Sequence, residues 1–241
     1  MRRSQLPADV AGISNNDIRL FLLSLQERNL SSSTVNTYYR VLHSFFSWLV
    51  NEGLLSRSPM QNIKPPRLTR VLIKPFSKQD IEKLLLLCSG ANFLAVRNKA
   101  IILLFLDTGL RLSELASIQL EDTDFERETI RVMGKGAKER VVRIGKTTQK
   151  AVLRYLLMRT DPYPCLWVTE ERRPLGARGV QMAIKRLCHR ANIKDAAPGP
   201  HTFRHTSAIN YLRNGGDVFT LQIMLGHSTL PRLKSSRLAI Q

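Results

Sequence analysis

The chain has 241 residues, enough for one large hydrophobic core or two modest ones, and its 37 lysines and arginines exceed its 19 acidic residues by a formal charge of +18. Such a surplus in a chain that is 43% hydrophobic indicates a polyanionic partner, most often nucleic acid. No apolar run approaches the roughly 20 residues that span a bilayer, and three cysteines without C-x-x-C spacing argue against a disulfide framework or a zinc ribbon and suit a reducing cytoplasm.

The first quarter of the chain shows helical patterns with clear starts. Ser14 to Asp17 resembles a capping box, and apolar residues recur behind it at helical spacing. Ser31 to Ser33 precede a second, longer pattern that stops at Gly53. A serine-proline pair then predicts a short third helix from Ser58 to about Ile63. Residues 1–66 are therefore predicted to form a small helical domain.

Residues 67–75 are predicted to be a basic, proline-containing linker. Pro65, Pro66 and Pro75 lie in or beside this stretch, and prolines interrupt helices and favour an extended path. A second domain is expected over residues 76–241. A basic linker between two basic domains favours a C-shaped clamp that closes around a nucleic-acid duplex. The alternative is that the charges only keep the linker solvated.

The second domain begins at another capping box, Ser77 to Asp80. A strongly apolar core helix is expected from Arg97 to Asp107, with Gly109 as its left-handed stop. Arg111 follows where this buried helix turns a corner, an unfavourable place for a guanidinium that lacks an anionic partner. It could bind a ligand anion, or it could pair with Glu114 or with the aspartate that ends the core helix.

Residues 129–144 change from helical to alternating spacing and predict a β-hairpin. Its tip carries Lys135 and Lys138 beside glycines, where a lysine is a mobile charge that can reach a phosphate or donate a proton. The alternative is an ordinary solvated hairpin tip. Two further helices, each apolar on one side and basic on the other, are expected at residues 147–159 and 177–192.

The stretch from residue 201 to residue 227 places two histidines and an arginine around two helices. His201 and Arg204 are three residues apart, so on a helix they point the same way. Asn214 to Asp217 separates the two helices, and Gly226 stops the second one immediately before His227. Such a set of donors suits an anionic oxygen, although each residue could also serve only its own helix or turn. The apolar residues expected to be buried are Ile209, Leu212, Val218, Leu221, Ile223, Met224 and Leu225.

Four segments in this order, TGLRLSEL, GKGAKER, HTFRH and LGHSTL, resemble the tyrosine recombinase (phage integrase) family, and the chain is similar in particular to bacterial recombinases that resolve chromosome dimers. The resemblance extends over nearly the whole chain, because the N-terminal helices are similar to that family's core-binding domain. It implies a mainly α fold with a small β-hairpin (α+β), in which a helical core-binding domain is followed by a mixed catalytic domain. It also implies double-stranded DNA as partner and a homo- or hetero-tetramer on synapsed DNA.

The resemblance further implies five catalytic residues in this sequence: Arg111, Lys135, His201, Arg204 and His227. Two arginines can bind the non-bridging oxygens of one phosphodiester and stabilise its pentacoordinate transition state. A lysine can protonate the leaving 5′ oxygen, and the histidines can assist. No cofactor and no metal are expected. His201 and His205 have the spacing of helical zinc ligands, but neither a following glutamate nor a third ligand accompanies them.

One position departs from the family pattern. The family's nucleophile is a tyrosine about nine residues after the last histidine, and here Ser236 occupies that place. No tyrosine follows Tyr211, and Pro231 lies where a helix is expected to continue. A truncated or altered tail, a deliberately disabled chain and a natural binding-only relative all explain this. A recombinase and a non-cleaving DNA-binding relative therefore both remain candidates, and a basic RNA-binding protein explains the charge but not the ordered motifs.

Overall fold

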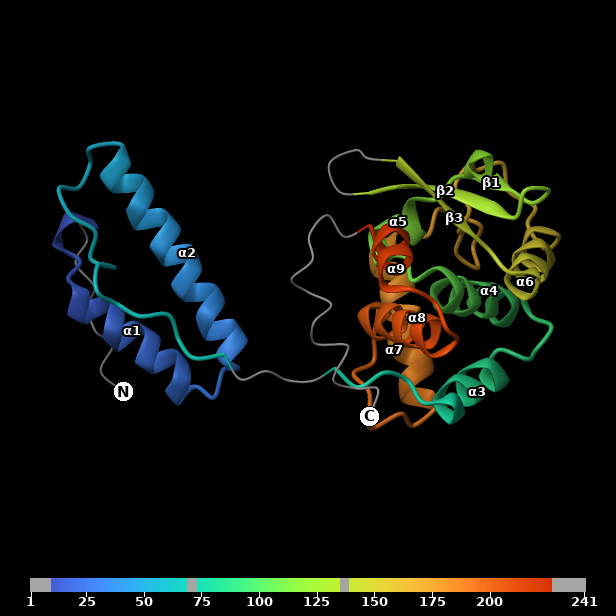
Figure 1. The fold of residues 1–241 in the computed structure, drawn as a ribbon, viewed down its shortest axis with the longest axis horizontal. Helices are drawn as coiled ribbons and strands as arrows, with labels where there is room; N and C mark the ends of the chain where they lie inside the picture. Colours follow the sequence, from blue (N-terminus) through green and yellow to red (C-terminus); the bar gives the residue numbers. More distant parts are fainter. Residues whose placement is uncertain (1–9, 69–72, 135–138, 227–241) are drawn as a thin grey trace. The chain divides into compact units, whose positions relative to one another are not determined.

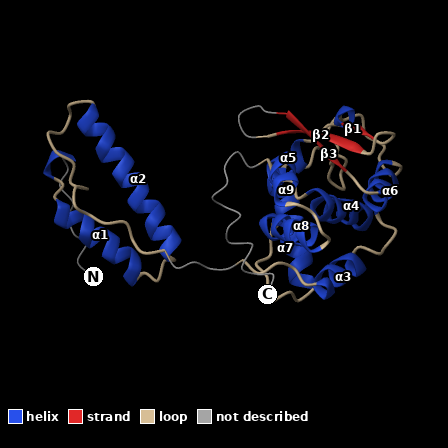
Figure 2. Ribbon diagram, in the orientation of Figure 1, coloured by secondary structure: helices blue, strands red, loops and turns tan. Residues whose placement is uncertain are grey.

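A computed structural model describes residues 10–68, 73–134 and 139–226, and the chain divides into two compact units, Met1–Leu72 and Ile73–Gln241 (Figure 1). Helices predominate in both units, and a three-stranded antiparallel sheet lies in the second (Figure 2). This confirms the mainly α fold with a small β element. Across the described ranges, no helix is long and apolar enough to cross a membrane.

The first unit is built on α1 (Asn15–Glu27) and α2 (Ser32–Asn51), which follow a short 3-10 turn at Val10–Gly12. The predicted capping box is present, because the Asp17 backbone N–H donates to Ser14 Oγ at 3.2 Å and the Ser14 N–H donates to the Asp17 carboxylate at 2.9 Å. Ser31 caps α2 by accepting from the Thr34 N–H at 3.2 Å. The two helices enclose a small core of Ile18, Leu22, Leu25, Val35, Tyr39, Phe46, Leu49 and Met60.

The short third helix predicted from Ser58 to about Ile63 is wrong. These residues form turns, and three of their carbonyls accept hydrogen bonds from side chains of α1 and α2. Asn15 donates to the Pro59 and Gln61 carbonyls, and the Tyr39 hydroxyl donates to the Ile63 carbonyl at 2.8 Å. Backbone groups that are satisfied in this way do not need helical partners.

The second unit surrounds one buried helix, α4 (Phe93–Thr108), which packs against α6 (Lys146–Leu156) and α8 (Pro200–Arg213). It begins a turn earlier than predicted because Asn92 caps it, accepting from the Ala95 N–H at 2.8 Å. Gly109 ends it at φ +61°, as predicted. The other elements of this unit are α3 (Lys78–Leu87), α5 (Leu112–Ser117), a 3-10 turn (Leu120–Asp122), α7 (Ala177–Arg190), α9 (Val218–Leu225) and the sheet.

The predicted hairpin is present as β2 (Thr129–Met133) and β3 (Glu139–Arg143), and a short strand that was not predicted, β1 (Thr123–Asp124), adds to β2. Ile130 pairs with Val142, and both side chains are buried. Arg140 shares the inward-facing side of β3 with Val142, whereas Glu139, Val141 and Arg143 point outward. The sheet therefore carries one arginine toward the interior of the unit.

Helices α8 and α9 end the described chain at the predicted places. Asp217 caps α9 by accepting from the Thr220 N–H, and Gly226 closes it at φ +61°. Ile209, Leu221 and Leu225 are buried as expected. Ile223 is 75% exposed, so its predicted burial is wrong. Helix α9 is apolar around most of its circumference, but only the side that carries Leu221 and Leu225 packs against α8.

The turn between α4 and α5 tolerates only glycine at position 109. A Cβ added there lies 2.9 Å from Leu225 Cδ2 and 3.1 Å from Ser207 Oγ, in addition to the left-handed φ. Gly215 is a matched control, since it has φ +86° but nothing within 4 Å of an added Cβ. We expect Gly215→Ala to lower the free energy of unfolding by about 1–2 kcal/mol from backbone strain, and Gly109→Ala to lower it further. Urea unfolding measures both, and equal losses would contradict the close approach of α9.

Candidate functional site

Arg111 lies at the corner between α4 and α5, as the sequence predicted. Its own backbone N–H donates to Glu114 Oε2 at 2.8 Å, and its Nη1 donates to Glu114 Oε1 at 2.7 Å. Its Nη2 reaches the carbonyl of Gly226 at 3.2 Å. Of the two salt bridges considered for Arg111 in place of a ligand anion, the one with Glu114 is present. The aspartate near the end of α4, Asp107, accepts from the Gly145 N–H instead.

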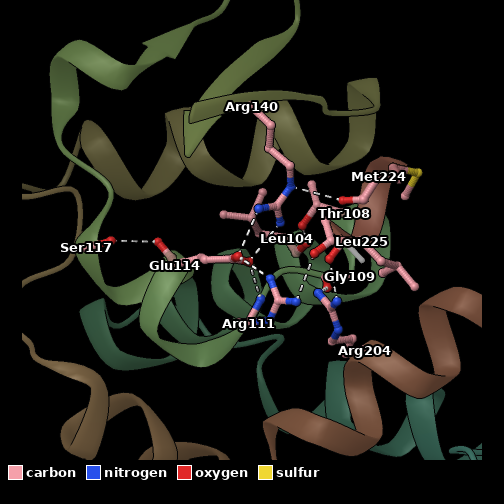
Figure 3. Close-up of polar contacts among 11 residues, drawn as sticks. Leu104, Thr108, Gly109, Arg111, Glu114, Ser117, Arg140, Arg204, Met224 and Leu225 are labelled. Carbon is pink, nitrogen blue, oxygen red and sulfur yellow. Dashed lines mark hydrogen bonds and ion pairs between the residues drawn. The ribbon is translucent and has the colours of Figure 1, made fainter. Parts of the chain in front are cut away.

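Glu114 is buried, with 3% of its side chain exposed, and it receives a second guanidinium from the sheet. Arg140 donates to both of its oxygens, each at 2.8 Å (Figure 3). Burial alone raises the pKa of a carboxyl group, but the hydrogen bonds from Arg140 and Arg111 outweigh it and lower the pKa of Glu114 to about 2. The carboxylate is therefore charged throughout the neutral range and binds two arginines at once.

Arg204 projects from α8 into the same region. Its Nη1 donates to the Gly109 carbonyl at 2.7 Å, and its Nη2 donates to the Leu225 carbonyl at 2.5 Å. Burial, together with the positive charges of Arg111 and Arg140, lowers the pKa of this guanidinium to about 10, and the negative charge of Glu114 opposes the shift. Arg204 therefore remains a cation at neutral pH, in a position where additional negative charge is favourable.

Three arginines from three elements meet at the end of α9. The carbonyls of Met224, Leu225 and Gly226 accept from Arg140, Arg204 and Arg111 respectively. These are terminal carbonyls of a helix, which lack partners within the helix and carry the negative end of its dipole. Figure 3 shows the arginine side chains converging on this segment. The site is thus assembled by the last turn of α9.

Of the other predicted site residues, only His201 lies in the described part of the chain. His201 lies in the first turn of α8 with an exposed side chain. Lys135, His227 and the nucleophile position Ser236 fall outside the described residues. His205 is half-buried, and burial lowers the pKa of its imidazole. Within the described ranges, no group of three or more His, Cys, Asp or Glu residues could hold a metal ion.

Arg140 is the member of the cluster that sequence reasoning missed. A signal was present, because on β3 the inward-facing positions are those of Arg140 and Val142, and a cation on the core-facing side of a strand needs an anionic partner. The sequence indicates Glu114 only as a partner for Arg111, three residues before it. Its second arginine is 26 residues away in sequence, on an element that no local pattern connects with α5.

The cluster has a net positive charge suited to a phosphodiester. Three guanidinium groups and one carboxylate leave two net positive charges. A phosphodiester carries one negative charge, and its pentacoordinate transition state carries one more, so the balance of charge favours the transition state. A guanidinium has five N–H donors, and the contacts of the Arg111 side chain with Glu114 and Gly226 engage two of them.

Because the pKa of Glu114 is low, the free energy of unfolding should depend on the ionisation of this carboxyl group. A carboxyl group whose pKa falls from an ordinary 4.5 to about 2 on folding contributes stability above pH 4.5, and this contribution is lost as the pH falls through about 2. At 1.36 kcal/mol per pKa unit it amounts to about 3 kcal/mol. We expect Glu114→Gln to lower the free energy of unfolding by about this much at pH 7, and the gap between wild type and variant to shrink as the pH falls from about 5 to 2.

The neighbouring Glu139→Gln is the control, since that side chain is exposed. Chemical denaturation across a pH series measures both variants. A gap for Glu114→Gln that stays constant with pH would contradict the ion-paired carboxylate.

Known protein families match most of the chain. Residues 74–234 match the family described as "Phage integrase family", and residues 5–54 match "Phage integrase, N-terminal SAM-like domain". Similar curated relatives include a tyrosine recombinase XerD of Halalkalibacterium halodurans, 32% identical over 224 residues, which covers 90% of this chain and 75% of the relative. A tyrosine recombinase XerC of Bacillus subtilis is 32% identical over 222 residues, 89% of this chain and 73% of the relative. The chain thus spans about three-quarters of the length of these relatives.

Solved structures share the fold at low sequence identity. A Tn1549 transposon integrase in complex with a circular intermediate DNA has a TM-score of 0.77 at 20% identity, over 99% of this chain and 88% of that chain. A lambda integrase(75-356) dimer bound to a core site has a TM-score of 0.79 at 16% identity, over 94% of this chain and 84% of that chain. With the family matches and the curated relatives, these likenesses show that the chain belongs to the phage integrase family of tyrosine recombinases.

Proposed function

We propose that this chain binds duplex DNA at recombination sites and holds one phosphodiester at the arginine cluster. The observation that carries this proposal is the meeting of Arg111, Arg140 and Arg204 at the end of α9, where the Glu114 carboxylate binds the first two of them. The formal charge of +18 supports a polyanionic partner. Relatives with this fold were solved as complexes with DNA.

The proposed division of labour follows the two parts of the chain. Residues 1–66 act as a helical core-binding domain, residues 67–75 as a basic linker and residues 76–241 as a domain of the catalytic type with an atypical tail. Both domains contribute contacts to the DNA backbone. A homo- or hetero-tetramer on synapsed DNA is the assembly in which such chains exchange strands.

At the phosphate, Arg111 and Arg204 bind the two non-bridging oxygens and stabilise the charge that develops when phosphorus is attacked. In this proposal Lys135 protonates the departing 5′ oxygen, and His201 and His227 assist the nucleophile or the binding of the phosphate. These roles require no metal, because guanidinium groups supply the positive charge.

Strand cleavage requires a nucleophile in addition. The family's tyrosine position is occupied by Ser236, whose hydroxyl is one carbon from the backbone and far less acidic than a phenol, which has a pKa of about 10. We therefore propose that the chain with serine at position 236 binds its DNA site without cleaving it. A chain in which a tyrosine follows His227 at the family distance would be a complete recombinase that exchanges strands by phosphodiester transesterification.

Selection of bound duplexes from a randomised library, followed by affinity measurements in a salt series, tests DNA binding by the intact chain. We expect affinity to fall steeply with salt because bound cations release condensed counterions. Arg204→Lys should weaken binding to the selected duplex about tenfold although the charge is kept, since lysine cannot form the bidentate fork. The control Arg213→Lys, exposed at the end of the same helix, should bind like wild type. Equal binding by both variants would exclude Arg204 from the phosphate site.

The absence of cleavage is tested on a nicked suicide duplex that traps covalent protein–DNA intermediates. We expect the unmodified chain to bind this duplex and to form no adduct that withstands denaturation. Ser236→Tyr is the informative variant, because an adduct formed by this variant alone shows that only the nucleophile is missing. A covalent adduct of the unmodified chain, mapped to any residue, would contradict the proposal that it does not cleave.

A further inference from the structure

We propose that Arg140 is a positioning residue of the phosphate site, which fixes both the guanidinium of Arg111 and the last turn of α9. The inference rests on the proposed function, because it concerns the geometry of the same site. It assigns a role to a residue that lies outside the five predicted catalytic positions. Arg140 acts through its neighbours, without a contact of its own to the phosphate.

Arg140 fixes the Glu114 carboxylate through a bidentate contact. Arg140 holds both carboxylate oxygens at 2.8 Å, and Arg111 shares both of them, one through its side chain and one through its backbone. A carboxylate fixed by a bidentate guanidinium has little rotational freedom, so the Arg111 guanidinium that it contacts is held in one orientation. Without Arg140, Glu114 could rotate and Arg111 would lose that orientation.

Arg140 also contacts the end of α9. Arg140 Nε donates to the Met224 carbonyl at 3.1 Å, while Nη1 and Nη2 of the same guanidinium bind Glu114. A Cβ added at Gly226 lies 3.2 Å from Arg140 Nη1 and 3.5 Å from Arg111 Nη1, which shows how closely the guanidinium groups lie against this turn. Arg140 therefore connects β3, α5 and α9, and only 14% of its side chain is exposed. Through α9 it also fixes the Leu225 and Gly226 carbonyls to which Arg204 and Arg111 donate.

Charge alone does not explain this arrangement. Arg143 lies three residues further along the same strand, is exposed and points away from the interior, so it adds the same charge to the unit without these contacts. A lysine at position 140 keeps the charge opposite Glu114 but cannot donate to two carboxylate oxygens and a carbonyl from a rigid fork. A comparison of Arg140 with Arg143 therefore distinguishes the effect of these contacts from the effect of positive charge alone.

A double-mutant cycle tests the inference on the selected duplex. We expect Arg140→Lys to weaken DNA binding about tenfold in the wild-type background but less than about twofold in an Arg111→Lys background, because residues that act through one another are not additive. Arg143→Lys, the control, should bind like wild type in both backgrounds. Circular dichroism and thermal unfolding establish that each variant is folded. Lysine is chosen at position 140 because it keeps a positive charge beside the buried Glu114 carboxylate.

Hydrogen exchange of peptides covering α9 gives an independent readout, and we expect faster exchange of its last turn in Arg140→Lys than in Arg143→Lys. Additive losses of affinity in the two backgrounds, or unchanged affinity despite faster exchange, would overturn the inference and leave Arg140 a structural residue. If the wild-type chain selects no duplex DNA, the proposed function itself fails, which is a different outcome from either of these.

Discussion

The site depends on one buried carboxylate. Glu114 is almost fully covered and would be strongly unfavourable as an isolated ion, but two guanidinium groups and a backbone N–H compensate for its burial. The same contacts also determine where the arginines lie. An ion pair of this kind adds little net stability compared with a well-packed apolar group, whereas loss of one partner leaves an uncompensated buried charge. Its principal effect here is to fix the geometry of a cationic cluster.

The fold brings the other parts of the site to this carboxylate. The buried helix α4 ends at Gly109, whose left-handed conformation turns the chain so that α5 can present Glu114. Leu225 packs against the same glycine, and its carbonyl accepts from Arg204, which also binds the Gly109 carbonyl. Packing and hydrogen bonding therefore act on the same few residues. The close approach of α9 to the corner between α4 and α5 places three arginines around the helix end.

The sequence predicted the local features of this architecture well. Capping boxes at Ser14 and Ser77, the glycine stop at position 109 and the hairpin after residue 129 depend on neighbouring residues, and all are present. The features that failed depend on distant contacts. The helix expected after Ser58 is replaced by turns because Asn15 and Tyr39 bind its carbonyls, and Arg140 was missed because its partner lies on another element. Arg111 and Arg204 are indicated both by their places in the sequence and by the family motifs, and the structure adds that they meet at the end of α9.

The central claim is that the arginine cluster binds a single phosphodiester of duplex DNA. The most direct test replaces one backbone phosphate at a time in the selected duplex by a neutral methylphosphonate and compares wild type with Arg111→Lys and Arg204→Lys. A position should exist at which the neutral group weakens binding by wild type and has little further effect on either variant, because the contact is already lost. Variants that respond to every substitution as wild type does would show that these arginines bind no particular phosphate and would contradict the account.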